Sequence, residues 1–441
     1  MVPATYRAFV RQLPRWLPRR LPRLLTEKLP EPPPVLRRGP LRENAFPSRL
    51  HDPRMAALLG VWLGIAFGTC FLTGLVSHFM QHPPSWLEWP SRPAWLYRVT
   101  QGLHVTTGLA SVPLLLAKLW TVYPLLWEWP PIRSVAHAVE RMTIVPLIAG
   151  AIFQLSTGIA NIAQWYRFHF FFTVTHYWVA WITIGALVLH IVAKLTVIRA
   201  NVGRRRHERA HLAAATMATT TMATTTMATT TMATTTMAGA APGTGGLTRR
   251  GLGLATGTAA GVIVATTAGQ SVPGLARLDL LAPRRPDIGP QGLPVNRTAR
   301  AARVTSLARD PGYRLEVVGP RRVVYTIEEL HALRRYSSKL PITCVEGWAA
   351  DATWHGPRLR DLLDAAMIPA DATVRVESLE ARGGYRASDV NPSHARDSLT
   401  LLATGVNGAD LDLDHGYPAR LIAPNRPGVL QTKWVHRVVM V

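Results

Sequence analysis

The chain has 441 residues, which is too long for one ordinary domain, so we expect two or more. Hydrophobic residues make up 48% of it and charged residues only 17%, a balance typical of membrane proteins rather than soluble ones. The net charge of +23 would suit nucleic acid, but the basic residues lie beside apolar segments and no basic-plus-aromatic recognition motif accompanies them, so nucleic acid is not an expected partner.

A basic arm, residues 1–50, precedes four apolar segments that are each long enough to cross a bilayer. These segments run from Met55 to Phe79, from Val99 to Tyr123, from Met142 to Gln164 and from Thr173 to Ile198. Arginines crowd residues 199–209 as well as the arm, and such basic flanks are typical of cytoplasmic ends. Residues 51–200 therefore predict a four-helix membrane domain in the cell membrane, with lipid around it and both ends inside.

Residues 201–247 are predicted to be a low-complexity linker. Within them, residues 216–238 repeat Thr-Met-Ala-Thr-Thr with a period of five, which matches neither a helix nor a strand and favours a flexible tether. The alternative is a metal-binding array of methionines, which would use Met217, Met222, Met227, Met232 and Met237.

The segment LTRRGLGLATGTAAGVIVATTAGQ resembles a twin-arginine export signal, with Arg249 and Arg250 before a weakly apolar run. We assign residues 248–271 to this signal anchor. An ordinary fifth membrane helix with two basic anchors is the alternative. Either interpretation crosses from inside to outside and places the rest of the chain on the extracytoplasmic side. The export interpretation adds the twin-arginine export machinery as a partner, because that pathway carries proteins already folded around a cofactor.

After a second linker, residues 272–300, the last part of the chain reads as a soluble domain, residues 301–441. RLEVVGPRRVVYTIEELHAL predicts a strand, a turn, a strand and a short helix, and HGPRLRDLLDAA predicts an amphipathic helix. Val374 to Glu377 and Ala419 to Ala423 predict further strands. The predicted fold class is multi-domain: an all-α transmembrane four-helix bundle plus a fifth membrane helix, then an α+β domain.

Histidines inside membrane segments are candidates for function. His176 and His190 are 14 residues apart, so on one helix they lie about 21 Å apart along the axis and face nearly the same direction. Two haems stacked across the bilayer require that arrangement, with each iron taking its second imidazole from another helix. His104 has a depth similar to that of His176, while His51 is the preferred partner of His190. Of the other histidines, His137 lies before the third segment, whereas His78 lies at the outer end of the first segment and so does not suit the inner side. Packed or interfacial histidines are the non-functional alternative.

Three stretches, SRLHDPRMAALLGVWLGIAFGTCFLTGL, YRVTQGLHVTTG and THYWVAWITIGALVLHIVAK, resemble the di-haem cytochrome b membrane subunits of bacterial formate dehydrogenases and nickel–iron hydrogenases. The resemblance covers about residues 45–200. It implies one or two haems b, an outer one on His104 and His176 and an inner one on His51 and His190. The family often has His-Trp where this chain has His51 followed by Asp-Pro.

Cys344 is one of only two cysteines, and Cys70 lies in an apolar segment far from it in sequence. Two cysteines cannot build a disulfide framework. A buried structural thiol, a nucleophile with His355 or His394 as its base, a zinc ligand, and a single thiolate on a soft metal all remain open for Cys344.

The segments TCVEGWAADATWHG, VRVESLE, LLATGVNGADL and HGYPARLIAPNRPGVLQTKWV resemble, in this order, the molybdopterin-binding domain of the sulfite oxidase family. The branch most similar to it is the catalytic subunit of periplasmic methionine sulfoxide reductase, and the resemblance spans about residues 300–441. It implies that Cys344 is the catalytic residue and the protein ligand of the molybdenum. The pterin and its phosphate are expected to contact Ser378, His415, Arg420, Gln431, Thr432, Lys433 and, by a weaker alignment, Asn296. Ser378 and His415 replace the threonine and asparagine of the family.

Together these features predict a membrane-bound molybdopterin-dependent oxidoreductase that passes electrons between quinone, haem b and a molybdenum–pterin centre for oxygen-atom transfer. The expected substrate is a small S- or N-oxide or an oxidised protein methionine. Sulfite-type oxidation with haem as the acceptor is one alternative. A cofactor-free, membrane-tethered binding or scaffold protein is another.

Overall fold

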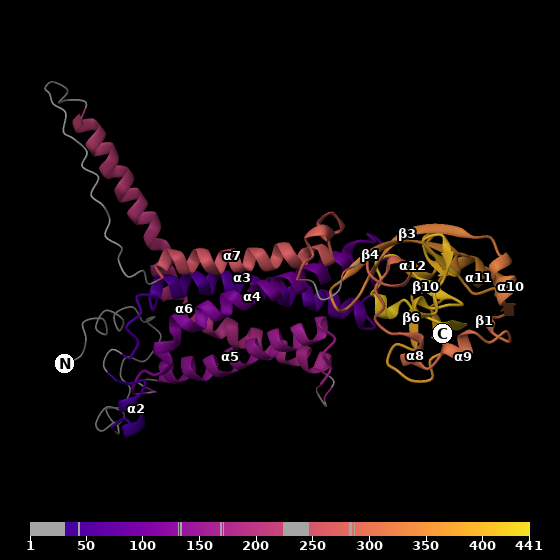
Figure 1. Cartoon of the computed structure of the whole chain (residues 1–441), viewed down its shortest axis with the longest axis horizontal. Helices are drawn as coiled ribbons and strands as arrows, with labels where there is room; N and C mark the ends of the chain where they lie inside the picture. The colour runs from indigo at the N-terminus through magenta and orange to yellow at the C-terminus, as the bar shows by residue number, and fades with distance from the viewer. Residues whose placement is uncertain are drawn as a thin grey trace. The chain divides into compact units, whose positions relative to one another are not determined.

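The computed structural model describes residues 31–42, 45–130, 132, 135–167, 170, 172–223, 247–281, 285 and 287–441. The chain divides into two compact units. The first contains residues up to Ile65, Ser111–Gln154 and Val174–Ala260; the second contains Ala66–Ala110, Leu155–Thr173 and Gly261–Val441. The second unit thus joins parts of the apolar helices to the whole C-terminal domain (Figure 1).

Among the residues that the structure describes, five helices are long and apolar enough to cross a membrane, which indicates a membrane protein. The candidate spans are Pro53–Gln81, Leu96–Leu126, His137–Ile162, Thr173–Asn201 and Arg249–Gln270. They belong to α3 (Pro53–Gln81), α4 (Leu96–Leu126), α5 (Val135–Ile162), α6 (Phe172–Ala223) and α7 (Arg249–Thr267). The four predicted segments and the fifth helix are therefore helical, with α3 and α4 extending beyond the predicted limits. A short helix, α2 (Pro34–Arg38), precedes them.

Helix α6 continues far beyond its apolar part, and this differs from the prediction for the linker. Its first eight repeat residues, 216–223, are helical rather than an irregular tether. Residues 213–215 are all alanine, a strong helix former, and adding residues to a helix that has already formed is easier than starting one, so α6 can continue through threonines that form helices poorly. Met227, Met232 and Met237 lie outside the described residues.

The C-terminal domain contains three β-sheets, in agreement with the predicted α+β class. The strands are β1 (Arg314–Val318), β2 (Arg322–Thr326), β3 (Tyr336–Thr343), β4 (Ala349–Gly356), β5 (Val374–Ser378), β6 (Ala387–Val390), β7 (Leu401–Ala403), β8 (Gly405–Val406), β9 (Ala409–Asp410), β10 (Arg420–Ile422) and β11 (Val435–Met440). The five-stranded sheet has the order β2-β1-β11-β5-β6, the four-stranded sheet β3-β4-β8-β9, and β10 pairs with β7. Only the β1–β11 pair is parallel among these neighbours.

Short helices cover and connect the sheets. They are α8 (Ala299–Ala302), α9 (Thr305–Ala308), α10 (Ile327–Ala332), α11 (Leu359–Ala365), α12 (Pro392–Ala395), and the short 3-10 helices η2 (Ala268–Gln270), η3 (Pro273–Leu278), η4 (Pro290–Gly292), η5 (Leu413–His415) and η6 (Gly428–Leu430). Thr326 caps α10 through a reciprocal pair of hydrogen bonds with Glu329, which fixes where this short helix starts.

Alternating apolar residues build the core of the five-stranded sheet. Leu315 and Val317 of β1 are fully buried, as the two-residue period of a half-buried strand requires. Helix α11 buries Leu359, Leu362 and Leu363 against the same core, at helical spacing. A second apolar cluster contains Cys344, Trp348 and Trp354, so the lone cysteine lies in the core beside the four-stranded sheet.

Candidate functional site

Cys344 lies at the start of the turn that joins β3 to β4. The Cys344 amide donates to the carbonyl of Trp348 at 2.9 Å, and the Gly347 amide donates to the carbonyl of Cys344 at 3.1 Å. Gly347 has a φ of +100°, a conformation that residues with a side chain rarely adopt. The Cys344 side chain is buried and forms no disulfide. The hairpin thus holds one thiol at a defined position. We call residues Cys344–Trp348 the cysteine loop.

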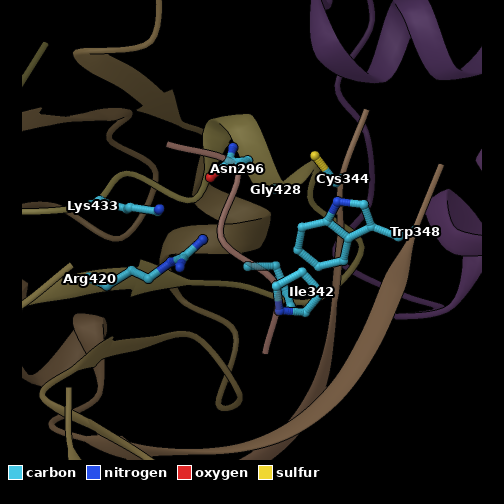
Figure 2. Close-up of a pocket in the computed structure, with 8 residues that line it drawn as sticks. Asn296, Ile342, Cys344, Trp348, Arg420, Gly428 and Lys433 are labelled. Atoms are coloured by element: carbon cyan, nitrogen blue, oxygen red, sulfur yellow. The ribbon is translucent and has the colours of Figure 1, made fainter. Parts of the chain in front are cut away.

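A small cavity opens beside the thiol. Figure 2 shows Arg420 and Lys433 extending into it from one side, with Cys344 and Trp348 on the opposite side. Its lining residues are Pro294, Asn296, Ile342, Cys344, Trp348, Arg420, Gly428 and Lys433. Cys344, Asn296, Arg420 and Lys433 were predicted from the sequence, and the fold brings these four together from distant parts of the chain.

The two cations of the cavity are held mainly by backbone carbonyls. Lys433 Nζ donates to the carbonyls of Arg297 at 2.9 Å and Asp414 at 2.7 Å. Arg420 is 3% exposed and donates from Nη1 to the carbonyl of His415 at 3.1 Å, while its buried Nε has no hydrogen-bond partner among the described residues. Burial lowers the pKa of Arg420 to about 9 and that of Lys433 to about 7. Positive charge that carbonyls only partly compensate favours a bound anion.

Four other predicted contact residues do not line this cavity. Ser378 ends β5, where its Oγ accepts from the Glu380 amide at 3.1 Å. Gln431 donates to the carbonyl of Arg426 at 2.9 Å, and Thr432 exchanges a hydrogen bond of 2.8 Å with Ser388. All three are buried, and the Oε1 of Gln431 has no partner in the part of the chain that the structure describes. Their assignment to the pterin stays a prediction.

His415 is the fourth residue outside the cavity lining. Its Nε2 lies 2.7 Å from the carbonyl of Pro290, and because a carbonyl only accepts, Nε2 carries a proton. The ring is 2% exposed, and burial lowers the pKa of His415 to about 4. His415 is therefore a neutral side chain that attaches the loop before α8, and its own carbonyl orients Arg420.

Several residues at or near the cavity were not singled out from the sequence. Trp348 and Gly428 line it directly. A Cβ on Gly428 would lie 2.8 Å from the carbonyl oxygen of Thr343, so this glycine allows η6 to approach the strand that leads to Cys344. Burial, followed by the negative charge of Cys344, raises the pKa of Tyr385, which places that phenol within electrostatic range of the sulfur. No local sequence signal marks Tyr385, because only the fold brings its loop near Cys344.

The two histidines considered as bases for a cysteine nucleophile are not part of the cavity. His355 lies on β4, paired with Ser337 of β3. His394 is buried on α12, where its Nδ1 lies 2.6 Å from Oδ1 of Asn391, and burial lowers its pKa to about 3. Neither ring is among the residues that line the space beside Cys344. The geometry therefore favours a thiol facing an anion-binding cavity over a thiol paired with a base.

In the membrane region of the second unit, His104 of α4 contacts α3. Its Nδ1 lies 2.8 Å from the carbonyl oxygen of Cys70 and 3.5 Å from the Cys70 sulfur. A Cβ on Gly74 would lie 2.6 Å from two atoms of the same ring. The α3 backbone, and the lack of a side chain at Gly74, thus shape the space around the His104 imidazole.

The first unit contains the other three predicted haem ligands. Helix α6 is unbroken between His176 and His190, so the predicted spacing of the two rings along one helix stands. The Nδ1 of His190 is buried without a hydrogen-bond partner among the described residues. His51 precedes α3 by two residues, and its Nδ1 lies 3.3 Å from the carbonyl of Thr121. No alternative inner partner is selected by these contacts, and haem ligation stays a prediction.

Known proteins similar to this chain point to the same kind of site, one that binds an anionic cofactor. Residues 302–441 match the family of the oxidoreductase molybdopterin binding domain. Mitochondrial sulfite oxidase of Homo sapiens is 28% identical over 155 residues, covering 29% of this chain and 28% of that protein. A putative protein-methionine-sulfoxide reductase subunit, YedZ1 of Azospira oryzae, is 28% identical over 125 residues, covering 28% of this chain and 47% of that protein.

Among solved structures, the sulfane dehydrogenase SoxCD from Paracoccus pantotrophus has 25% sequence identity and a TM-score of 0.27, with 30% of this chain and 38% of that chain covered. The chain therefore spans less than half the length of each of these three relatives. The C-terminal domain is an oxidoreductase domain of the molybdopterin-binding class. The chemistry of the thiol and of the two buried cations suits the soft metal and the anionic part of such a cofactor.

Proposed function

We propose that the protein is a membrane-bound molybdenum oxidoreductase that reduces S- or N-oxides with electrons supplied by quinol through haem b. One observation carries the proposal: a thiol on a rigid hairpin faces two buried cations across a cavity. A soft metal takes a thiolate ligand, and the phosphate of a pterin takes the cations. In this arrangement Cys344 holds the molybdenum, and Arg420 and Lys433 hold the negatively charged part of the pterin.

The bound molybdenum–pterin group would supply two-electron oxygen-atom transfer. The chain's own residues bind and orient it. Lys433 Nζ donates two of its three N–H groups to carbonyls, which directs the third N–H toward the cavity. Trp348 closes the cavity beside the sulfur, and its Nε1 donates to the Glu346 carboxylate at 3.1 Å, which fixes the indole. Asn296 adds an amide from a distant loop.

The overall reaction balances without a further reagent. A sulfoxide that accepts two electrons and two protons becomes a sulfide and water, and one quinol releases two electrons and two protons as it becomes quinone. Methionine sulfoxide, small or in a protein, is the substrate class we propose. The similarity to YedZ1, whose name specifies a putative protein-methionine-sulfoxide reductase subunit, supports this choice.

The membrane helices would carry the electrons. We propose an outer haem b on His104 and His176 and an inner one on His51 and His190. The hydrogen bond from His104 to the α3 backbone supports the first pair, because metal-binding imidazoles usually donate their other nitrogen in this way. The Nδ1 of His190 is buried with no hydrogen-bond partner among the described residues, which supports the second pair because a buried ring nitrogen without a hydrogen bond is available to a metal.

The basic residues of the N-terminal arm and of residues 199–209 support a cytoplasmic location for the ends of the first four helices. With the fifth helix, the catalytic domain would lie on the extracytoplasmic side. Export by the twin-arginine machinery stays part of the proposal. In the folded chain Arg249 pairs with Asp52 at 3.1 Å, so its charge also has a structural partner within the first unit.

Sulfite-type oxidation with haem as the acceptor is the second candidate, and the similarity to human sulfite oxidase favours it. The two reactions run electrons in opposite directions. Purified protein would be reduced with dithionite until the haem bands are ferrous, and then mixed with a panel of sulfoxides and N-oxides. Oxidised protein would be mixed with sulfite. Reoxidation by a sulfoxide supports our proposal, whereas reduction of the haem by sulfite supports the alternative.

Cys344→Ser should abolish either response. Ser338→Ala provides a matched control, because Ser338 is buried on the adjoining strand but does not line the cavity. Protein without haem b bands and without molybdenum would contradict the proposal and leave only a scaffold role.

A further inference from the structure

Ends of three membrane helices contact the cysteine loop directly, and every residue involved belongs to the second unit. The carbonyl of Val345, the residue after Cys344, accepts from Gln101 Nε2 at 2.8 Å and from Asn161 Nδ2 at 3.4 Å. Gln101 lies on α4 and is 4% exposed, and Asn161 lies near the end of α5. In Figure 2 the ribbon beside Cys344 and Trp348 has the purple of these earlier helices.

The next two residues of the loop are held in the same way. Gln164, just after α5, donates to Oε1 of Glu346 at 2.5 Å. Ser271, which follows α7, donates to the carbonyl of Gly347 at 2.7 Å. A Cβ on Gly347 would lie 2.7 Å from a methyl carbon of Val105, so α4 also touches the loop by close packing. We call Gln101, Val105, Asn161, Gln164 and Ser271 the docking site.

Charged and polar pairs extend the contact around the docking site. Arg98 of α4 forms a 2.8 Å ion pair with Asp351 of β4 and donates to the carbonyl of Ser271 at 2.7 Å. At a separate place, Arg92 pairs with Asp397 at 3.0 Å. Only 12% of the Arg98 side chain is exposed, so this ion pair is partly removed from water. Val345, Glu346 and Gly347 each take part in a hydrogen bond with a helix end. A flexible tether alone would not produce such a specific contact.

We propose that the docking site holds the catalytic domain in place during turnover, and that the Gln101–Val345 hydrogen bond is the path by which electrons enter it. This inference rests on the proposed function. His104 follows Gln101 by three residues on α4 and is the neighbour of Val105. The proposed outer haem ligand, His104, is therefore connected to Cys344 in three steps. One helical turn leads from His104 to Gln101, one hydrogen bond leads from Gln101 to Val345, and one peptide unit leads from Val345 to Cys344. Electron transfer through a protein weakens steeply with distance, and contiguous bonds shorten the gaps that it has to cross.

The docking is tested without any cofactor. A recognition sequence for a site-specific protease is inserted after Asp287, an exposed linker residue, and membranes containing the full chain are cleaved and washed. We expect residues 288–441 to stay on the wild-type membranes. Arg98→Asp places like charges opposite each other and should increase release roughly tenfold. The charge-reversed double variant, Arg98→Asp with Asp351→Arg, should recover part of the retention.

Release of the wild-type fragment in the wash would overturn the docking proposal. So would a double variant that is released as readily as Arg98→Asp alone, because the ion pair would then have no role in retention.

The electron path is tested with Gln101→Leu, which removes the amide and keeps the side-chain size. Reoxidation of the ferrous haem by a sulfoxide should slow by a factor of roughly 10 or more, since a buried carbonyl loses its donor and the loop loosens. The haem spectrum should not change. Arg322→Gln is the matched control: it removes an ion pair with Glu316 on the five-stranded sheet, which belongs neither to the docking site nor to the cavity lining, so both retention and the reoxidation rate should stay the same. A wild-type reoxidation rate in Gln101→Leu would overturn the path.

The proposed function and the proposed docking can be contradicted separately. A wild-type protein without haem b would remove the proposed function and the electron path with it, while the retention of the cleaved fragment would still decide the docking. Normal haem and molybdenum with a fragment that washes off would leave the proposed function in place and remove the docking.

Discussion

The imidazole of His104 donates its Nδ1 proton to the backbone carbonyl of Cys70, at 2.8 Å. A carbonyl oxygen can only accept, so this contact selects the tautomer in which Nε2 carries the lone pair. Iron and zinc bind the neutral ring through such a nitrogen, and the bond made by the other nitrogen orients the ring. The backbone of α3 thus orients the His104 ring, and in the neutral ring it leaves Nε2 available for the ligation that we propose.

Gly74→Ala should therefore disrupt the outer haem. The added Cβ would lie 2.6 Å from the His104 ring, closer than non-bonded atoms approach, and the ring would have to move. We expect purified Gly74→Ala protein to show a shifted or diminished haem b band and altered low-spin electron paramagnetic resonance.

Gly68→Ala on the same helix serves as the control, because a Cβ there meets nothing within 4 Å. Equal haem spectra in both variants would argue against His104 as a ligand.

Cys344→Ser should leave the fold intact and remove the molybdenum. Serine is close to cysteine in size but its alkoxide is a poor ligand at neutral pH for a soft metal. Elemental analysis of the purified variant is expected to show at least a tenfold loss of molybdenum, roughly the effect of losing one ligand's contribution. Circular dichroism should match the wild type. Full molybdenum content in Cys344→Ser would remove Cys344 from the metal site.

Cofactor binding should weaken as pH rises above about 7. Burial holds the pKa of Lys433 near that value in the cofactor-less protein, against 10.5 normally. The ammonium form pairs with the pterin phosphate, so binding at higher pH must first supply a proton. Loading of cofactor-less protein is expected to be weaker at about pH 9 than at about pH 6, and Lys433→Gln should bind weakly at both.

The same pKa has an opposite effect on the stability of the cofactor-less chain. Between pH 7 and 10.5 the unfolded chain keeps the Lys433 proton that the folded chain has lost, so this residue makes folding more favourable as pH rises. A loading curve that is independent of pH in the wild type would contradict the assignment of Lys433 to the phosphate.

Trp354→Ala should destabilise the catalytic domain and also loosen Arg420, whose guanidinium lies over the Trp354 ring, 5.5 Å from its centroid. Trp354 is fully buried in the cluster that contains Cys344, and its Nε1 donates to the carbonyl of Leu340 at 3.2 Å. Truncation of such a side chain costs about 3–5 kcal/mol of unfolding free energy. Thermal unfolding of the full chain, followed by tryptophan fluorescence, would show an earlier transition. Leu307→Ala, at a side chain that is 47% exposed, should leave that transition within a few degrees.

Much of the organisation follows from local sequence. The apolar segments were long enough to predict helices, and α3 to α7 confirm them. Alternation in RLEVV and the turn that follows predicted β1 and β2, which the structure contains. These features depend on hydrophobic length and on residue period, which neighbouring residues determine. The helical start of the methionine repeat was missed, because the five-residue period does not show that a helix formed by the preceding residues can continue into the repeat.

The sequence by itself determined that this is a membrane protein with a C-terminal α+β domain, and it singled out Cys344, Arg420 and Lys433. Only the tertiary structure decided that Asn296 joins them at one cavity while Ser378, His415, Gln431 and Thr432 do not line it. It also decided that Gln101 and Ser271 hold the cysteine loop. Hydrophobic patterns act over a few residues, whereas a cavity or a docking contact joins segments hundreds of residues apart, and packing alone determines which side chains meet there.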